Sequence, residues 1–87
     1  MKQKIFPVYD SKAGAFASPF FMPTLGMATR AFSDECNNPT SSLNKHSEDY
    51  TLFELGEFDD ASGKLEVYST PKSIGLAFDF LSCGQAG

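Results

Sequence analysis

Residues 50–68 decide the expected fold, and they read Tyr-Thr-Leu-Phe-Glu-Leu-Gly-Glu-Phe-Asp-Asp-Ala-Ser-Gly-Lys-Leu-Glu-Val-Tyr. Residues 50–58 have the apolar alternation of a β-strand, with Phe53 and Leu55 facing one way and Leu52 the other. Residues 59–64 have turn chemistry, and Gly63 is placed for a left-handed backbone conformation. Residues 65–68 can therefore pair back on the first strand, and the stretch predicts a β-hairpin.

A second hairpin is expected before it. Residues 3–9 predict a strand, residues 10–14 a turn and residues 15–22 a return strand, in which Pro19 indicates a sheet edge or a bulge. The first strand is apolar on both faces, and a small protein seldom buries both faces of a strand by itself. We therefore expect a second copy or a partner to cover one face, and a symmetric homodimer is the simplest arrangement.

A helix is expected between the two hairpins. Thr24 can cap its first turn, and Asn38-Pro39 ends it. Apolar residues recur at helical spacing on one side and predict the stripe that packs on the sheet. The stripe consists of Leu25, Ala28, Phe32 and Cys36, widened by Met27 and Ala31.

Two connecting segments are less regular. Residues 37–49 form a polar loop that is long for so small a domain, which indicates either mobility or function, and Leu43 is its one candidate anchor. Residues 73–81 fit a short helix or a further strand, because apolar residues alternate there and Gly75 weakens a helix. Residues 82–87 form a peripheral tail. Together the elements predict one α+β domain over residues 1–87, with a small antiparallel sheet of two hairpins and one covering helix.

Composition sets further bounds. A chain of 87 residues, 41% hydrophobic and 21% charged, can fold around one modest core. Cys36 and Cys83 are too few and too far apart for a metal motif or a disulfide framework, so we expect reduced thiols. No segment approaches the roughly 20 apolar residues that span a bilayer, and the N-terminus lacks the apolar stretch of a signal peptide. These features predict an intracellular protein.

Candidate catalytic and metal-binding residues are sparse. His46 with Glu48 and Asp49 could hold a metal or act as a base, but no second His follows, and such a sequence is more typical of a turn or a helix cap. Asp59 and Asp60, with Glu57, could bind Mg²⁺, although turn chemistry explains them equally well. The glycines are isolated, so no phosphate-binding loop is present. We expect no metal site, no cofactor and no enzymatic activity.

The charge distribution is uneven. The chain carries a net charge of −4, which opposes binding to nucleic acid. Residues 1–33 carry a net charge of +3, and residues 34–66 a net charge of −7. The early basic residues are interleaved with aromatic residues, on which bases of a single strand can stack at roughly 1–3 kcal/mol each. The predicted nucleic-acid site consists of Lys2, Lys4, Lys12, Arg30, Tyr9, Phe16 and Phe20.

Two functions therefore remain open. The first is a weak, non-specific single-stranded DNA-binding module. The alternative is a protein-interaction factor whose contact surface is the acidic middle of the chain. If the fold collects the four early basic residues on one concave face, DNA is favoured; if it scatters them, a protein partner is favoured.

Several short sequence segments occur in an unusual order along the chain. Residues 27–34 read Met-Ala-Thr-Arg-Ala-Phe-Ser-Asp, residues 44–53 read Asn-Lys-His-Ser-Glu-Asp-Tyr-Thr-Leu-Phe, and residues 56–59 read Gly-Glu-Phe-Asp, with Pro-Phe-Phe at 19–21 before them and Ser-Gly at 62–63 after them. In this order the chain resembles the small nonstructural protein of gokushoviruses, microviruses with a circular single-stranded DNA genome. The resemblance covers about residues 3–81.

This resemblance implies a protein that is made in the infected bacterium, resides in the host cytoplasm and is absent from the virion. It also implies a role in synthesis or packaging of the single-stranded genome. The phage replication initiator, the procapsid or a host protein is then a candidate partner. No catalytic or binding residue can be transferred from the family.

Overall fold

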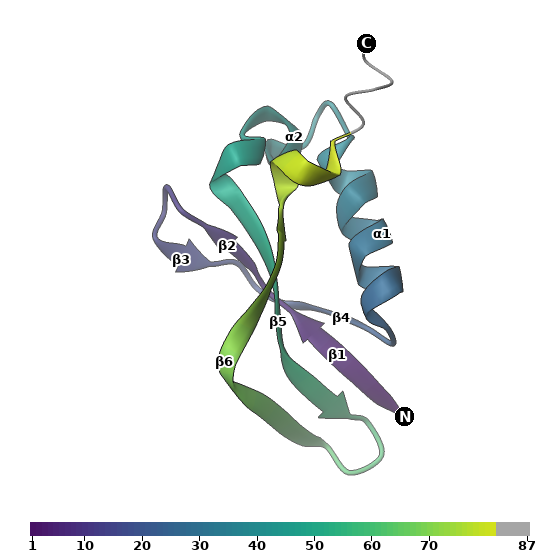
Figure 1. Cartoon of the computed structure of the whole chain (residues 1–87). Helices are drawn as coiled ribbons and strands as arrows, with labels where there is room; N and C mark the ends of the chain where they lie inside the picture. Colours follow the sequence, from purple (N-terminus) through teal and green to yellow (C-terminus); the bar gives the residue numbers. More distant parts are fainter. Residues whose placement is uncertain (82–87) are drawn as a thin grey trace.

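The computed structural model describes residues 1–81 and has an α+β fold, in which one long helix packs against an antiparallel sheet (Figure 1). This is the fold class that the sequence predicts. The elements, in order, are β1 (Lys2–Phe6), β2 (Val8–Asp10), β3 (Ala15–Phe16), β4 (Phe20–Met22), α1 (Leu25–Cys36), α2 (Ser42–Lys45), the 3-10 helix η1 (Ser47–Asp49), β5 (Tyr50–Asp59), β6 (Lys64–Leu76) and the 3-10 helix η2 (Ala77–Phe80).

The sheet consists of the two expected hairpins laid side by side. β1 and β2 form one strand interrupted at Pro7, and β4 and β3 pair with them as the interrupted return strand. Pro19 lies in that second interruption, as its missing N–H requires. β5 pairs with β1 and β2 along one edge and with β6 along the other. Both hairpins are thus confirmed, and Gly63 takes the left-handed conformation, with φ of 76°.

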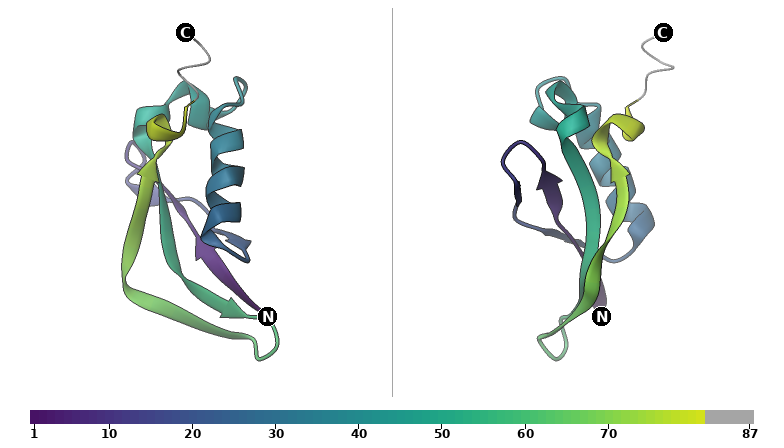
Figure 2. Two further views of the ribbon diagram at one scale, coloured as in Figure 1. Left: turned by 45° about the vertical axis from the view of Figure 1, so that its right-hand side comes forward. Right: turned by 60° about the vertical axis from the view of Figure 1, so that its left-hand side comes forward.

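β5 contains an irregularity that the sequence does not reveal. Ile5 lies opposite Gly56, whereas Val8 lies opposite Leu52, so β5 has one more residue than its neighbour between these two pairs. On the other edge Glu54 pairs with Lys72 and Gly56 with Val67, which leaves residues 68–71 as a bulge in β6. Bulges bend strands, and β6 is visibly bent midway along its length (Figure 2).

The core lies between α1 and the upper part of the sheet. It consists of Phe6, Ala28, Phe32, Cys36, Leu52 and Ala77. The N-terminal cap is the expected one, because Thr24 Oγ1 accepts a hydrogen bond from the Met27 N–H at 3.1 Å. The helix stripe is confirmed at Ala28, Phe32 and Cys36, which are buried.

Two residues of the expected stripe do not belong to it. Leu25 is 38% exposed and Met27 is 51% exposed. Leu25 is the first residue of the helix, one turn before the first buried position, and Met27 lies about 100° around the helix from Ala28. The buried stripe is consequently narrower than the sequence predicts.

The argument that β1 needs a second copy is wrong. Ile5 is 3% exposed and Phe6, on the opposite face of the strand, is 0% exposed, so the chain itself buries both faces. α1 packs on the face that carries Phe6, and on the other face Ile5 lies between Phe21 of β4 and Gly56 of β5. Other apolar side chains remain exposed, and they are considered below.

The connection over residues 37–49 has structure of its own. It contains α2, which Ser41 caps, and η1, and Leu43 packs against the core as expected. Residues 73–81 do not form a further strand: β6, whose sequence prediction ended at residue 68, continues to Leu76, and the short 3-10 helix η2 follows. The tail over residues 82–87, including Cys83, lies outside the described residues.

Replacement of Phe32 by Ala is expected to lower the free energy of unfolding by about 3–5 kcal/mol, because a large buried ring would leave a cavity. Phe32 is 2% exposed, and its ring meets that of Phe80 edge-on at 5.3 Å. Met27→Ala, on the exposed side of the same helix, serves as the control and should change stability by less than about 0.5 kcal/mol. Equal urea midpoints for the two variants would contradict this packing.

Replacement of Gly56 by Ala is expected to destabilise the protein by about 1–3 kcal/mol through a clash in the sheet. A Cβ atom at this position would lie 2.8 Å from Val67 Cα and would also meet the Glu66 carbonyl oxygen, and neither backbone atom can yield unless β6 shifts. Gly26→Ala, in the open first turn of α1, should instead stabilise by up to about 1 kcal/mol. Thermal unfolding of both variants measures the contrast, and a neutral Gly56→Ala would show that the β5–β6 contact is looser than described.

Candidate functional site

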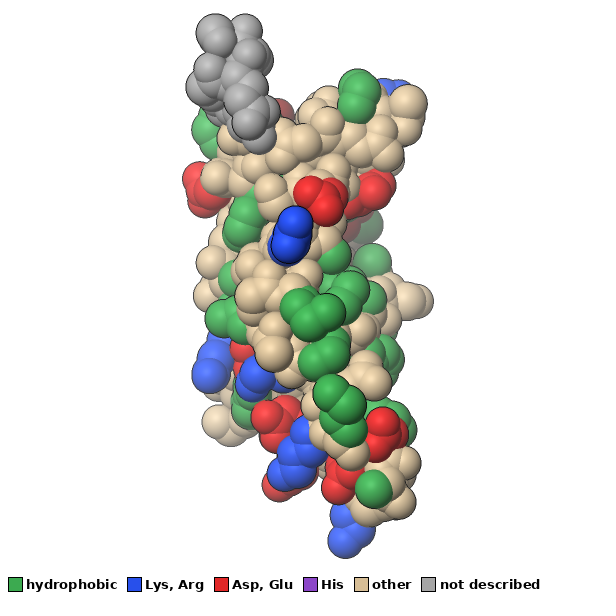
Figure 3. Space-filling view, turned by 90° about the vertical axis from the view of Figure 1, so that its right-hand side faces the viewer, with side chains coloured by type: hydrophobic (Ala, Val, Ile, Leu, Met, Phe, Trp, Pro, Cys, Tyr) green, Lys and Arg blue, Asp and Glu red, His purple; other side chains and the backbone are tan. Residues whose placement is uncertain are grey.

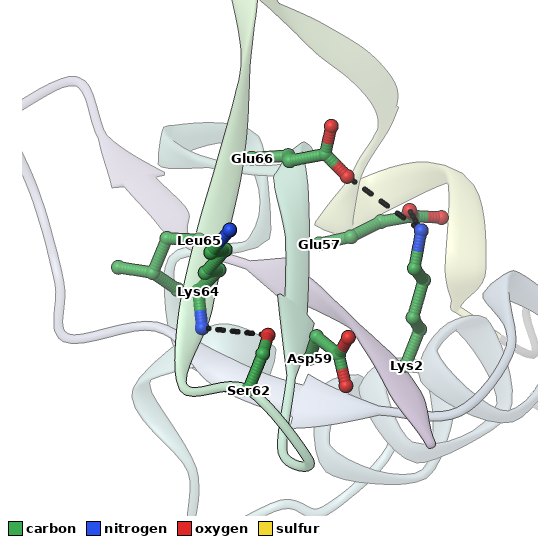
Figure 4. Close-up of a pocket in the computed structure, with 7 residues that line it drawn as sticks. All are labelled: Lys2, Glu57, Asp59, Ser62, Lys64, Leu65 and Glu66. Atoms are coloured by element: carbon green, nitrogen blue, oxygen red, sulfur yellow. Dashed lines mark hydrogen bonds and ion pairs between the residues drawn. The ribbon is translucent and has the colours of Figure 1, made fainter.

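The lower end of the sheet, which extends beyond α1 in Figure 1, carries a group of charged side chains on the face that the helix covers higher up. Two cross-strand rows supply them, Lys2–Asp59–Lys64 and Lys4–Glu57–Glu66. Lys2 Nζ lies 3.6 Å from Glu66 Oε1 and 4.0 Å from Glu57 Oε1. A hollow at this end of the sheet is lined by five of these charged residues together with Ser62 and Leu65 (Figure 4). The five are Lys2, Glu57, Asp59, Lys64 and Glu66. Because the hollow carries both signs of charge, it has little preference for an anionic ligand.

A buried carboxylate lies next to this group. Glu54 is 3% exposed, and its Oε2 atom accepts a hydrogen bond from the Tyr68 hydroxyl. Lys4 Nζ lies 3.4 Å from the same oxygen and 3.5 Å from Glu57 Oε2. A buried charge is tolerated only when it is paired and hydrogen-bonded, and Glu54 meets both conditions.

These contacts shift the pKa values of the two partners. The hydrogen bond to Glu54 raises the pKa of Tyr68, and burial adds to the shift. Burial is the largest single influence on the pKa of Lys4 and lowers it, but Glu54, Tyr68 and Glu57 together outweigh burial, so the pKa of Lys4 is raised overall. The raised pKa values keep Lys4 and Tyr68 protonated at neutral pH, which is typical of a structural cluster.

The structure does not bring the four predicted basic residues together. Lys2 and Lys4 lie on β1 and engage carboxylates of the same chain. Lys12 is exposed in the turn between β2 and β3, and Arg30 is exposed on α1. On the face shown in Figure 3, Lys and Arg side chains alternate with Asp and Glu and form no separate basic area.

The predicted aromatic residues divide into two environments. Tyr9 and Phe16 form a ring cluster with centroids 4.9 Å apart, and Phe16 is 48% exposed. Phe53 joins this cluster at 5.4 Å from Phe16. Phe20 instead stacks on the core residue Phe6 at 5.6 Å. Its neighbour Phe21 is the exposed member of the pair, at 43%.

Phe53 was missed as a site residue because the nucleic-acid prediction considered only the basic first third of the chain. The signal that could have found it is its position on β5. It faces away from Leu52, on the side of the sheet opposite α1.

The residues considered for metal binding or catalysis have local structural roles. His46 is exposed between α2 and η1, where its carbonyl oxygen accepts a hydrogen bond from the Asp49 N–H at 2.9 Å. Asp59 accepts a hydrogen bond from the Ala61 N–H at 3.0 Å, which lowers the pKa of the carboxyl group. Burial raises the pKa of Cys36 to about 11, so its thiol stays protonated. Within residues 1–81, no three His, Cys, Asp or Glu side chains group in a way that could hold a metal ion.

Comparison with known proteins gives one match. The family model described as Phage ORF5 protein matches residues 3–80. Neither the curated proteins nor the solved structures that were searched contain a match. In the part of the chain that the structure describes, no helix is both long enough and apolar enough to cross a membrane.

The raised pKa of Tyr68 predicts a loss of stability at alkaline pH. A group whose pKa is higher in the folded protein contributes its full stabilisation below its unfolded pKa of about 10, and loses it as the pH rises through the folded value. The free energy of unfolding should therefore fall above about pH 10, and Tyr68→Phe should make this fall shallower. Urea unfolding across the alkaline range measures both proteins, and identical pH profiles would show that the Tyr68 hydroxyl does not interact with Glu54 in solution.

Proposed function

The chain belongs to the phage ORF5 protein family, and on that premise we propose that it is a nonstructural accessory protein of a gokushovirus. It acts in the cytoplasm of the infected bacterium, in synthesis or packaging of the single-stranded DNA genome, and is absent from the virion. The family match supports the phage origin, and the order of the short sequence segments between residues 27 and 59 supports the narrower assignment to gokushoviruses.

The proposed mode of action is contact with another protein, namely the phage replication initiator, the procapsid or a host factor. The observation that carries this proposal is that Lys2 and Lys4 are engaged by Glu54, Glu57 and Glu66. Non-specific affinity for DNA comes from lysines and arginines that are available to phosphates. With its net charge of −4, the chain would repel a polyanion across most of its surface.

The proposed function requires no catalytic step and no cofactor. The buried acid Glu54 is fully engaged by Tyr68 and Lys4, and the exposed His46 lies in a turn. A partner protein would contact the charged and the apolar surfaces of the molecule.

Single-stranded DNA binding is a second candidate, and one specific feature favours it. The cluster of Tyr9, Phe16 and Phe53 lies beside the turn that carries Lys12, and Phe16 is 48% exposed. An exposed ring beside an available lysine is the minimal element for stacking a base and neutralising its phosphate. Arg30 lies on α1, on the other face of the sheet from this cluster.

The two candidates differ in their expected salt dependence. We expect the protein to bind purified replication initiator or procapsid at micromolar concentration and to show no single-stranded DNA binding at physiological salt. If DNA binds at low salt, Lys12 and Arg30 allow at most two phosphate contacts, which gives a slope of log affinity against log salt of about −1.4 or shallower. Fluorescence anisotropy with a labelled oligonucleotide measures the slope.

Paired variants sharpen the comparison. Lys12→Gln with Phe16→Ala tests the aromatic cluster, and Lys64→Gln with Lys72→Gln is the control. The protein-contact proposal fails if the wild type binds single-stranded DNA tightly with a slope near −3, if only the first pair weakens that binding, and if neither purified phage protein binds.

A further inference from the structure

At the lower end of the sheet, charged and apolar side chains lie on opposite faces. The charged rows occupy the face that α1 covers higher up, because Lys4 lies two residues before the core residue Phe6 on the same strand. On the opposite face, Phe21, Ile5, Gly56 and Val67 form one continuous row across β4, β1, β5 and β6. The next row contains Gln3, Phe58 and Leu65. The second face is therefore apolar, and neither row contains a charged residue.

This apolar face is open to solvent in the single chain. Val67 is 57% exposed, Leu65 is 59% exposed and Phe21 is 43% exposed. The Phe21 and Phe58 rings meet at 5.8 Å on this face. Figure 4 shows the Leu65 side chain pointing away from Lys2, Glu57 and Glu66, to the other side of the ribbon.

The face continues upward without a charged side chain. A hollow between the two hairpins is lined by Pro7, Phe16, Ala17, Pro19, Leu55 and Pro71. Above it, Phe53 lies opposite Ser73 and Tyr9 lies opposite Thr51. The uncharged face therefore extends over both hairpins, from Leu65 to Tyr9.

Strict alternation of charged and apolar residues is the pattern of a sheet with one wet face and one covered face. At the lower end the wet face is already assigned, because the Lys2, Lys4, Glu57 and Glu66 ion pairs occupy it. The apolar face is the one that the pattern leaves to be covered, and no element within residues 1–81 covers Leu65 or Val67.

We propose that a second copy of this chain packs on this uncharged face, in a symmetric dimer centred on Phe21, Phe58, Leu65 and Val67. Two sheets can stack face to face at about 10 Å with their strands nearly aligned. In a two-fold arrangement the exposed residues Phe21, Leu65 and Val67 face the same residues of the second copy, so the surface is complementary to itself in chemistry.

Charge favours a second copy as the occupant. The lysines of the charged face, Lys2 and Lys4, are already paired with Glu57 and Glu66 of the same chain, so contact through the charged faces would compete with these ion pairs. Contact through the uncharged face keeps both sets of ion pairs on the outside of the dimer. An acidic or basic partner, in contrast, would find no complementary charge on this face.

The available area also suits a dimer. Four large apolar side chains of this face, Phe16, Phe21, Leu65 and Val67, are each 43–59% exposed. At about 150–250 Å² for a large side chain, their exposed parts amount to roughly 300–500 Å². A stable interface covers about 800 Å² per partner, of which about 65% is apolar in homodimers, or roughly 500 Å². The two areas are of the same order.

The test is the molar mass in solution, measured by light scattering and sedimentation at micromolar concentration. The wild type should have the mass of two chains, and Val67→Lys should have the mass of one, because it places a charge in the centre of the interface. Glu66→Gln is the matched control: it changes the neighbouring residue on the charged face and alters the net charge equally, and it should remain dimeric. Leu65→Gln, a milder change on the same face as Val67, should raise the dimer dissociation constant at least tenfold.

Circular dichroism shows whether each variant is folded. A wild type with the mass of one chain throughout the micromolar range overturns the proposal, as does a Val67→Lys variant that is folded and still dimeric. A monomeric wild type whose binding to a purified phage protein is abolished by Val67→Lys would assign the face to that protein instead. The inference is independent of the proposed function, because a monomeric Val67→Lys variant can be tested separately for binding to the initiator or procapsid.

Discussion

The close approach of β5 and β6 at Gly56 is the constraint on which the rest of the structure depends. The two backbones can come together there only because residue 56 has no side chain, and a Cβ atom would meet the backbone of Glu66 and Val67. Beside this contact β5 gains one residue relative to its neighbour, and β6 bulges over residues 68–71. Both irregularities let Leu52 and Glu57, which an unbroken strand would place on opposite faces, lie on the same face of the sheet.

The extra residue in β5 shifts its pairing by one position, and because of this one-residue slip the two halves of the sheet carry different side chains. Above it, Leu52 and Val8 face the helix and help to form the core. Below it, the same face carries Lys4 and Glu57, while Glu54 is buried at the boundary with Tyr68. The slip therefore separates a part of the sheet that is stabilised by the helix from a part that is stabilised by ion pairs and has an apolar reverse side.

Much of the fold could be predicted because the signals are local. Turn residues at Asp59 and Gly63, the Thr24 cap and the spacing of Ala28, Phe32 and Cys36 each act within a few residues of their own position. The extra residue of β5 depends on its pairing with β1 and β2, between residues as far apart in sequence as Ile5 and Gly56, which no local pattern encodes. For the same reason the sequence predicted Lys2 and Lys4 as binding residues but could not place Glu54, Glu57 and Glu66 beside them. The sequence also could not show which of Phe20 and Phe21 is exposed. Adjacent strand positions face opposite sides of the sheet, and only the strand register identifies Phe21 as the exposed one.

The central position of β1 has a consequence for synthesis of the protein. β1 leaves the ribosome well before β5, yet it pairs with β5 as well as with β4, and Lys4 contacts a carboxylate partner 50 residues later in the chain. The first hairpin must therefore wait, with one edge unpaired, until most of the chain has emerged. Contacts between residues so distant in sequence slow folding, and an unpaired edge invites association with other chains. Where many copies are synthesised together, many such partly formed sheets are present at once, and the speed with which β5 closes the edge limits the yield of native protein.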